Sequence, residues 1–362
     1  MSGADRKIRI ACLLAELSSY LVACCRELAV HYGAELLIVH LPVNKDAPFS
    51  LDLDWISSRR DRSELSNGDL VALVRQFQPD AVFAAGWGDA GYRKVAKDSK
   101  KRGVNVVVGF DTHWKGTVRQ RAAAFLAPLW LHEIANALWV TGERQAQLAN
   151  KLGYAGSKCW TGVYCCDWEN FSSPADDSTP QSFLYVGRYV EEKGVSDLMK
   201  AYSVYRALSP APWPLHCSGT GNLRDVIGNA SGVTDLGFVQ PTQLPGVIRK
   251  YAGALILPSR FEPWGVVLQE AGACRRPVIC SDACGAAPHL AHHLYNALRF
   301  APGDSAELGN CMIEFSALPS ERRREMGEAG FQLASQFTPR RWARTLVEGL
   351  DTLTRERQSH RV

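Results

Sequence analysis

The chain has 362 residues, of which 46% are apolar and 22% are charged, a composition typical of a folded protein with two domains of ordinary size. The formal net charge of +4 is too small to argue for a nucleic-acid partner, and no run of about 18 uncharged apolar residues predicts a membrane span. The eleven cysteines show no C-x-x-C spacing, so we expect reduced packing thiols in a cytoplasmic protein.

The first half alternates short apolar runs with helical patterns. Its opening residues, MSGADRKIRIACLL, predict a strand instead of a signal peptide. Helical periodicity at 17–31 and 69–77 separates apolar runs, which indicates a parallel sheet with helices on both faces. Residues 44–67 show no clear pattern and are expected to form a long loop. The apolar runs predict strands at 8–14, 35–41, 81–85, 104–109, 138–141 and 158–163.

The segment SSPADDSTP, which ends at residue 180, has the composition of a linker, and the alternation restarts after it. A helix is predicted over 193–208, and two more over 321–337 and 340–354. Strands are predicted at 182–186, 215–218, 234–238, 254–258, 277–280 and 298–300.

These patterns predict an α/β protein with two Rossmann-like domains that face each other across a cleft. The expected domains are an N-terminal one over 1–172, a linker over 173–180 and a C-terminal one over 181–337. The last segment, 338–362, is expected to be a helix that packs back on the first domain and ends in a frayed tail.

Two cations surround the loop that follows the first strand of the second domain. In GRYVEEKG, Arg188 comes directly after the strand and Lys193 precedes a helix. Cations and free N–H groups at this edge of a sheet suit a phosphate or diphosphate. A surface loop whose cations pair with Glu191 and Glu192 explains the pattern equally well. Gly219, in SGTGNL, would let the backbone approach a ligand or would only form a turn.

Two glutamates flank a helix start in the stretch SRFEPWGVVLQEA. Glu262 lies on the loop, and Glu270 lies on the helix that Gly265 and Val266 begin. The helix start attracts an anion, whereas an ionised carboxylate accepts hydrogen bonds from hydroxyl groups. A diphosphate between two polyols, as in a nucleotide sugar, satisfies both. The alternative is that Glu262 interacts with the helix N-terminus and that Glu270 is a solvated helix residue.

Taken in order, these motifs resemble glycosyltransferase family 4, retaining enzymes with the two-domain GT-B fold. The matching stretches are VGRYVEEKG, SGTGN, DLGFV, PSRFEPWGVVLQEA, RRPVICSD and YNALRFAPGD, and the Glu-x7-Glu spacing of Glu262 and Glu270 is the family's signature. The resemblance implies a hexosyltransferase that moves a hexose-type sugar from a UDP- or GDP-linked donor to an acceptor hydroxyl. It further implies a role in the biosynthesis of cell-surface polysaccharide, lipopolysaccharide or glycoconjugates.

The resemblance also implies roles for single residues. Arg188 and Lys193 match the pair that binds the diphosphate, Glu262 matches the contact to the donor sugar, and Glu270 matches the contact to the ribose. Phe238 and Val239 match the segment beside the nucleobase. The donor-binding residues expected from it are Arg188, Lys193, Gly219, Phe238, Val239, Glu262, Gly265, Val266 and Glu270.

Acceptor recognition is expected in the first domain. In FDTHWKG, His113 follows a strand, where family members often have a histidine close to the transferred sugar, although a lone histidine is more often structural. His113 is therefore expected to act in catalysis with Glu262, Arg188 and Lys193. Asp111 would orient the histidine ring or contact the acceptor. The turn LLAELSSYL lacks the glycine of many family members, so Glu16 and Ser18 are expected to face the acceptor.

We expect no metal and no cofactor, because Arg188 and Lys193 supply the positive charge at the diphosphate. The expected partners are the nucleotide-sugar donor and a saccharide, lipid-linked or small-molecule acceptor, without nucleic acid. Residues 115–135 are basic and then apolar, which is typical of a buried helix or of one on the inner face of a membrane. A sugar-nucleotide epimerase of the same fold and a non-catalytic nucleotide-sugar-binding protein remain alternatives.

Overall fold

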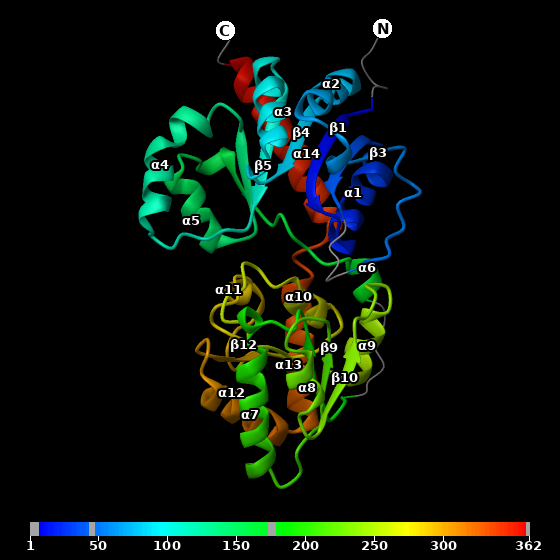
Figure 1. Cartoon of the computed structure of the whole chain (residues 1–362), viewed down its shortest axis with the longest axis vertical. Coiled ribbons are helices and arrows are strands. Elements are labelled where there is room, and N and C mark those ends of the chain that lie inside the picture. Colours follow the sequence, from blue (N-terminus) through cyan, green and yellow to red (C-terminus); the bar gives the residue numbers. More distant parts are fainter. Residues whose placement is uncertain (1–6, 43–47, 173–178, 360–362) are drawn as a thin grey trace. The chain divides into compact units, whose positions relative to one another are not determined.

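The computed structural model describes residues 7–42, 48–172 and 179–359, which form two compact units (Figure 1). The first unit holds the described residues of Met1–Asn44, Leu51–Cys165 and Pro339–Val362, and the second holds those of Lys45–Ser50 and Cys166–Thr338. Each unit contains one parallel sheet with helices packed on it. The two Rossmann-like domains predicted from the sequence are therefore confirmed.

The sheet of the first unit runs in the order β3-β2-β1-β4-β5-β6-β7. Strand β3 pairs with β2 and lies inside the region predicted to be a loop. The prediction missed this strand because its sequence, SRRD, is polar and gives no apolar run. The strands are β1 (Arg9–Glu16), β2 (Glu35–Leu41), β3 (Ser58–Asp61), β4 (Ala81–Ala85), β5 (Asn105–Phe110), β6 (Ala137–Val140) and β7 (Cys159–Thr161). The helices are α1 (Ser19–His31), α2 (Asn67–Phe77), α3 (Ala90–Lys101), α4 (Val118–Trp130), α5 (Glu143–Lys151) and α14 (Pro339–Ser359), with short 3-10 turns η1 (Arg62–Glu64) and η2 (Gly156–Lys158).

Helix α14 follows the second unit in the sequence and packs in the first, where it lies against α1. The ring of Trp342 stacks on Trp139 and meets the edge of Phe83, with ring centroids 4.6 and 5.6 Å apart. Gly349 lies so close to Trp160 that a Cβ atom there would collide with the indole ring. The apolar stripe that buries this helix consists of Trp342, Ala343, Leu346, Leu350 and Leu353.

The sheet of the second unit runs in the order β10-β9-β8-β11-β12-β13. The chain builds one side from β8 and then returns to build the other side from β11, so the strand order reverses between these two neighbours. Loops that leave the carboxyl ends of strands at such a point diverge and make room for a ligand. The strands are β8 (Phe183–Val186), β9 (Leu215–Ser218), β10 (Val233–Gly237), β11 (Ala254–Leu257), β12 (Val278–Ser281) and β13 (Ala297–Phe300). The helices are α6 (Trp168–Phe171), α7 (Val195–Leu208), α8 (Arg224–Gly228), α9 (Leu244–Tyr251), α10 (Val266–Ala273), α11 (Ala287–Leu290), α12 (Ser305–Ala317) and α13 (Ser320–Ala334), with the 3-10 turn η3 (Glu191–Lys193) before α7.

The cores of both sheets are apolar on both faces, as their continuous apolar runs predict. All four residues of β11 are buried, for example, as are all four of β6. The eleven cysteines are free thiols, ten of them buried and Cys159 half-buried. They pack as small apolar side chains, which is the role expected for them.

Candidate functional site

The loops after β8 and β11 leave the second sheet side by side at the point where its strand order reverses. Tyr185 on β8 pairs with Ile256 on β11, so the two strands end at the same edge. Arg188 and Lys193 follow β8, and Glu262 follows β11. The structure therefore brings together the charged residues that the sequence predicts at the diphosphate and the donor sugar.

Lys193 and Glu262 form a shielded ion pair. The Lys193 amino group donates to Oε2 of Glu262 at 2.8 Å, and both side chains are only 13% exposed. The hydroxyl of Ser259 donates to the same carboxylate oxygen at 3.3 Å. The second carboxylate near Lys193 belongs to Glu192, at 3.8 Å. The lysine expected to bind a diphosphate thus pairs with the glutamate expected to bind the sugar.

Arg188 is much more accessible. Its side chain is 47% exposed, and its guanidinium group lies 3.8 Å from the carboxylate of Glu192. Such an exposed pair contributes little to stability, so Arg188 can turn towards an anionic ligand at small cost. The alternative was that Arg188 and Lys193 pair with Glu191 and Glu192, and this pairing is found for Glu192. It is wrong for Glu191, which pairs with Arg260 at 3.0 Å instead.

Arg260 holds the loop after β11 in place through hydrogen bonds, a role that was not predicted from the sequence. Its guanidinium group makes two hydrogen bonds to the buried carboxylate of Asp197, at 2.7 and 2.8 Å. Its backbone N–H donates to the carbonyl of Glu192 at 2.9 Å, which ties the loop after β8 to the loop after β11. The position of Arg260 two residues before Glu262 was a signal available in the sequence.

Gly265 allows the chain to turn from Glu262 into α10. Its φ of +90° favours glycine, and a Cβ atom would stand 3.1 Å from both Cγ of Glu262 and Cδ2 of Leu257. Among the described residues no side chain caps this helix start, so its first backbone N–H groups, including that of Val266, offer donors to an anion.

Glu270 lies further along α10 in a partly buried position. Burial, and after it the negative charge of the neighbouring Asp167, together raise the pKa of its carboxyl group to about 8. Next to it, Gln269 accepts the backbone N–H of Cys166 at 2.7 Å, which fixes the start of the second unit on α10. The interpretation of Glu270 as an ordinary solvated helix residue is therefore wrong.

Gly219, the first glycine of SGTGNL, is required by the packing of the protein itself. Gly219 donates its N–H to the carbonyl of Gly237 at 2.9 Å, and a Cβ atom on it would collide with the carbonyl oxygen of Gly187. The missing side chain thus lets the loop after β9 pack on the loop after β8.

Phe238 and Val239 follow β10 at the same edge of the sheet. The ring of Phe238 packs on Phe49, with centroids 5.7 Å apart. Gln240 accepts the N–H of Ser50 at 3.0 Å and donates to the carbonyl of Pro48 at 3.1 Å. Part of the long loop predicted at 44–67 therefore covers the segment expected beside the nucleobase; residues 43–47 lie outside the described residues.

The four residues predicted for the acceptor side lie in the first unit, at or after the ends of β1 and β5, which both pair with β4. Glu16 is exposed at the end of β1, where the register with β2 shifts. Ser18 caps α1 by accepting the N–H of Leu21 at 3.5 Å, so its hydroxyl has a structural role.

Asp111 and His113 lie after β5. The carbonyl groups of these residues accept hydrogen bonds from Gln145, at 3.1 Å, and from Gln120, at 2.9 Å. Burial lowers the pKa of His113, and the charges of Lys115 and Arg144 lower it further. The lowered pKa favours the neutral form of the imidazole at neutral pH.

Asp52 and Asp54, which have a D-x-D spacing in the stretch LDLDW, lie on a polar loop of the first unit. Asp52 pairs with Arg26 at 2.9 Å and accepts the N–H of Asp54 at 3.3 Å. Within residues 7–42, 48–172 and 179–359, no three His, Cys, Asp or Glu side chains cluster closely enough to hold a metal ion.

Residues 167–333 match the family model described as glycosyl transferases group 1. Glycogen synthase of Mycobacterium tuberculosis is 28% identical over 183 residues, which cover 49% of this chain and 43% of that enzyme. D-inositol 3-phosphate glycosyltransferase of Jonesia denitrificans is 24% identical over 216 residues, which cover 53% of this chain and 50% of that enzyme. The chain thus spans half or less of the length of these curated relatives.

Solved structures match nearly the whole chain. The structure of Anabaena HepE in complex with UDP and glucose has a TM-score of 0.73 at 18% identity and covers 95% of this chain and all of that one. A glycosyltransferase from Rickettsia africae has a TM-score of 0.75 at 13% identity, with coverage of 97% and 99%. The fold is the GT-B fold, and the family match supports a glycosyltransferase.

Proposed function

We propose that this protein is a retaining glycosyltransferase of family 4 that moves a hexose-type sugar from a UDP- or GDP-linked donor to an acceptor hydroxyl. The observation that carries the proposal is the shielded ion pair of Lys193 and Glu262 at the point where the strand order reverses. Arg188 lies on the same loop as Lys193, and α10 begins shortly after Glu262. The complex of HepE with UDP and glucose supports a nucleotide-sugar donor.

In the proposed mechanism, the diphosphate attracts Lys193 away from Glu262. Lys193, Arg188 and the first N–H groups of α10 then stabilise the negative charge that develops on the leaving diphosphate. The freed carboxylate of Glu262 accepts hydrogen bonds from the sugar hydroxyls. Donor binding thus converts a closed ion pair into a sugar-binding group.

The remaining donor contacts follow from position. Glu270 accepts hydrogen bonds from the ribose, and Phe238 and Val239 lie beside the base. Gly265 and Val266 present backbone N–H groups, and Gly219 keeps the loop after β9 in place.

Transfer with retention proceeds on the face of the sugar that the diphosphate leaves. The bond between the anomeric carbon and the phosphate oxygen breaks, the bond to the acceptor oxygen forms, and the acceptor proton passes to the leaving phosphate. From the first unit, His113 in its neutral form contacts the transferred sugar, and Asp111, Glu16 and the segment around Ser18 contact the acceptor. Because Arg188 and Lys193 supply positive charge to the diphosphate, we expect activity to persist in EDTA.

A lipid-linked acceptor and contact with the inner face of a membrane are supported by α4, which lies at the outer edge of the first unit (Figure 1). Four of its large apolar side chains stay exposed: Val118 (84%), Phe125 (84%), Leu126 (45%) and Leu129 (72%). The interpretation of this segment as an ordinary buried helix is therefore wrong for this face.

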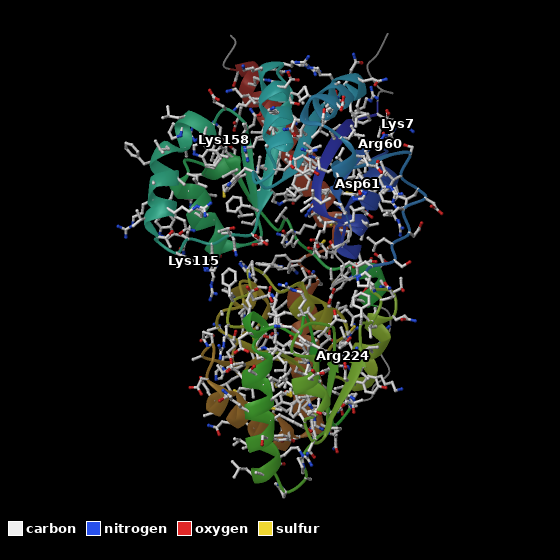
Figure 2. The ribbon with its side chains drawn as sticks, in the orientation of Figure 1. Lys7, Arg60, Asp61, Lys115, Lys158 and Arg224 are labelled. Carbon is white, nitrogen blue, oxygen red and sulfur yellow. The ribbon has the colours of Figure 1, made fainter. Side chains whose placement is uncertain are left out.

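The charge of this surface also suits anionic lipid. Val118, Phe125 and Leu129 share one side of the helix, and residues 115–132 contain no acidic side chain. Arg119 and Arg121 flank the apolar stripe, and Lys115 lies on the loop that leads into α4 (Figure 2). Apolar side chains between cations are typical of helices that lie on anionic membranes. No described helix is both long and apolar enough to cross a bilayer.

The test is a thermal-shift panel of UDP- and GDP-sugars, followed by NMR of the products formed with saccharide, lipid-linked and small-molecule acceptors. We expect one donor to raise the melting temperature and its sugar to be transferred with unchanged anomeric configuration. Rearrangement of the donor without an acceptor would indicate an epimerase. Donor binding without turnover on any acceptor would indicate a non-catalytic binding protein, and an inverted product would refute retention.

A further inference from the structure

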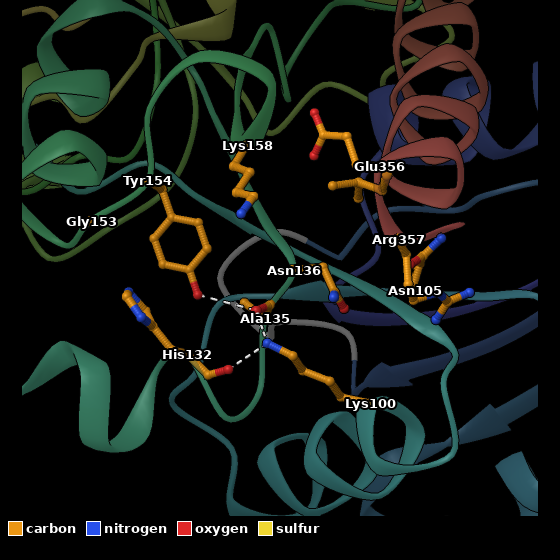
Figure 3. A pocket seen from close by; sticks show the side chains of 11 residues that line it. Lys100, Asn105, His132, Ala135, Asn136, Gly153, Tyr154, Lys158, Glu356 and Arg357 are labelled. Atoms are coloured by element: carbon orange, nitrogen blue, oxygen red, sulfur yellow. Dashed lines mark hydrogen bonds between the residues drawn. The ribbon is translucent and has the colours of Figure 1, made fainter. Parts of the chain in front are cut away.

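A cavity of about 330 Å³ opens in the first unit at the sheet edge opposite Asp111 and His113 (Figure 3). It lies where β5 and β6 begin, whereas Asp111 and His113 follow the end of β5. Its walls come from the end of α3, the loops before β6 and before β7, and the last turns of α14. This volume is in the range of sites for small molecules.

Three cations line this cavity: Lys100, Lys158 and Arg357. Figure 3 shows the amino groups of Lys100 and Lys158 directed towards the same space from opposite sides. Lys100 donates to the carbonyl groups of Ala135, at 2.6 Å, and of His132. An ammonium group has three N–H bonds, so one donor of Lys100 is left for a ligand. Burial lowers the pKa of Lys100, and the positive charge of Lys158 lowers it to a smaller extent. The two cations therefore lie close enough to repel each other.

The other polar groups of the cavity divide into donors and acceptors. Asn136 accepts the N–H of Val106 through its carbonyl oxygen at 2.9 Å, which leaves its amide N–H groups as donors. Asn105 donates to the hydroxyl of Thr354 at 2.9 Å, which leaves its side-chain oxygen as an acceptor.

Glu356 contributes the single carboxylate among the lining residues. Arg357 also donates to the carbonyl of Gly103, and the ring of His132 bonds the carbonyl of Leu152 at 3.0 Å. The cavity therefore holds an excess of positive charge together with acceptors suited to hydroxyl groups.

We propose that this cavity binds a small hydroxylated phosphomonoester, of the class of polyol or sugar phosphates. The phosphate lies between Lys100, Lys158 and Arg357, where charge-assisted hydrogen bonds are strongest. The hydroxyl groups donate to Glu356 and to the side-chain oxygen of Asn105. This site lies in the first unit and the residues proposed to hold the donor diphosphate lie in the second, so the two sites share no residue.

Calorimetric titration of the full chain at constant ionic strength tests the proposal, with glycerol 3-phosphate and inorganic phosphate as probes and glycerol as the uncharged control. We expect Lys158→Ala to raise the Kd of both phosphates at least about tenfold, because it removes one charged donor. Lys158 is exposed, so this variant keeps the fold. Arg357→Gln is the second test variant. Lys94→Ala, an exposed lysine of α3 outside the cavity, is the matched control and should bind like the wild type.

Two further variants test the hydroxyl acceptor of the cavity and distinguish the cavity from the proposed diphosphate site. Glu356→Gln should lower the preference for glycerol 3-phosphate over inorganic phosphate, because a hydroxyl acceptor loses its charge. Lys193→Ala should leave the affinity for both probes unchanged. Unchanged affinity in Lys158→Ala and Arg357→Gln, or loss of binding in Lys193→Ala, would overturn the proposal.

Discussion

Glu270 offers a quantitative test because its pKa couples stability to pH. The pKa is about 8 in the folded chain against an ordinary value of 4.5. The folded state thus binds the proton more tightly, so this group's contribution to stability is complete below pH 4.5 and is lost as the pH rises through about 8. Between pH 6 and pH 9 the loss amounts to about 2.5 kcal/mol, from about 1.4 kcal/mol per pKa unit weighted by the two titrations.

The Glu270→Gln variant cannot lose this proton. Urea denaturation of both proteins between pH 6 and pH 9 should therefore show the variant gaining about 2.5 kcal/mol relative to the wild type. Glu314→Gln, an exposed glutamate of α12, is the control and should follow the wild type. Parallel stability curves for Glu270→Gln and the wild type would refute the argument that burial holds this carboxyl group protonated.

The same titration predicts how a nucleotide binds. Ribose hydroxyls that donate to Glu270 favour its ionised form, so binding releases a proton below pH 8. Affinity for UDP or GDP should rise by up to about 50-fold from pH 6 to pH 8, and Glu270→Gln should remove this dependence. Calorimetry in buffers of different ionisation enthalpy measures the released proton directly. A heat of binding that does not depend on the buffer would exclude contact between Glu270 and the ribose.

Four further predictions concern the second unit and α4. Arg188→Ala should weaken binding of the nucleoside diphosphate by about 1.5–3 kcal/mol without changing stability, because the side chain is 47% exposed; Arg324→Ala is its calorimetric control. Glu262→Gln should abolish transfer and keep nucleotide affinity, and full turnover in this variant would remove Glu262 from the sugar site. Gly194→Ala should lower the free energy of unfolding by about 3 kcal/mol or more, because its φ is +72° and a Cβ atom would collide with the carbonyl of Pro258. Gly237→Ala, at a φ of +66° with no atom within 4 Å of the added Cβ, should cost only about 1–2 kcal/mol, and equal losses would contradict the role of the collision. The double variant Phe125→Ser, Leu129→Ser should reduce flotation with vesicles that contain phosphatidylglycerol at least about tenfold, whereas Val30→Ser, which removes an apolar side chain that is 78% exposed outside α4, should not.

The alternation of apolar runs with helical patterns was enough to predict both sheets, because a buried parallel strand needs apolar side chains on both faces whatever its neighbours are. Strand β3 escaped prediction for the same reason: its polar residues pair at an edge, where backbone hydrogen bonds suffice. The order of the motifs likewise placed Arg188, Lys193 and Glu262 after strands of the second unit.

Tertiary structure alone decided which of these groups meet. The order of the strands puts β8 beside β11, and from that adjacency come the ion pair of Lys193 with Glu262 and the brace of Arg260 on Asp197. Burial, which depends on what packs over α10, sets the pKa of Glu270. Burial also distinguishes α4, whose apolar face is exposed, from a core helix of similar composition. Local sequence specifies the elements because periodicity is local, whereas contacts and burial depend on residues far apart in the chain.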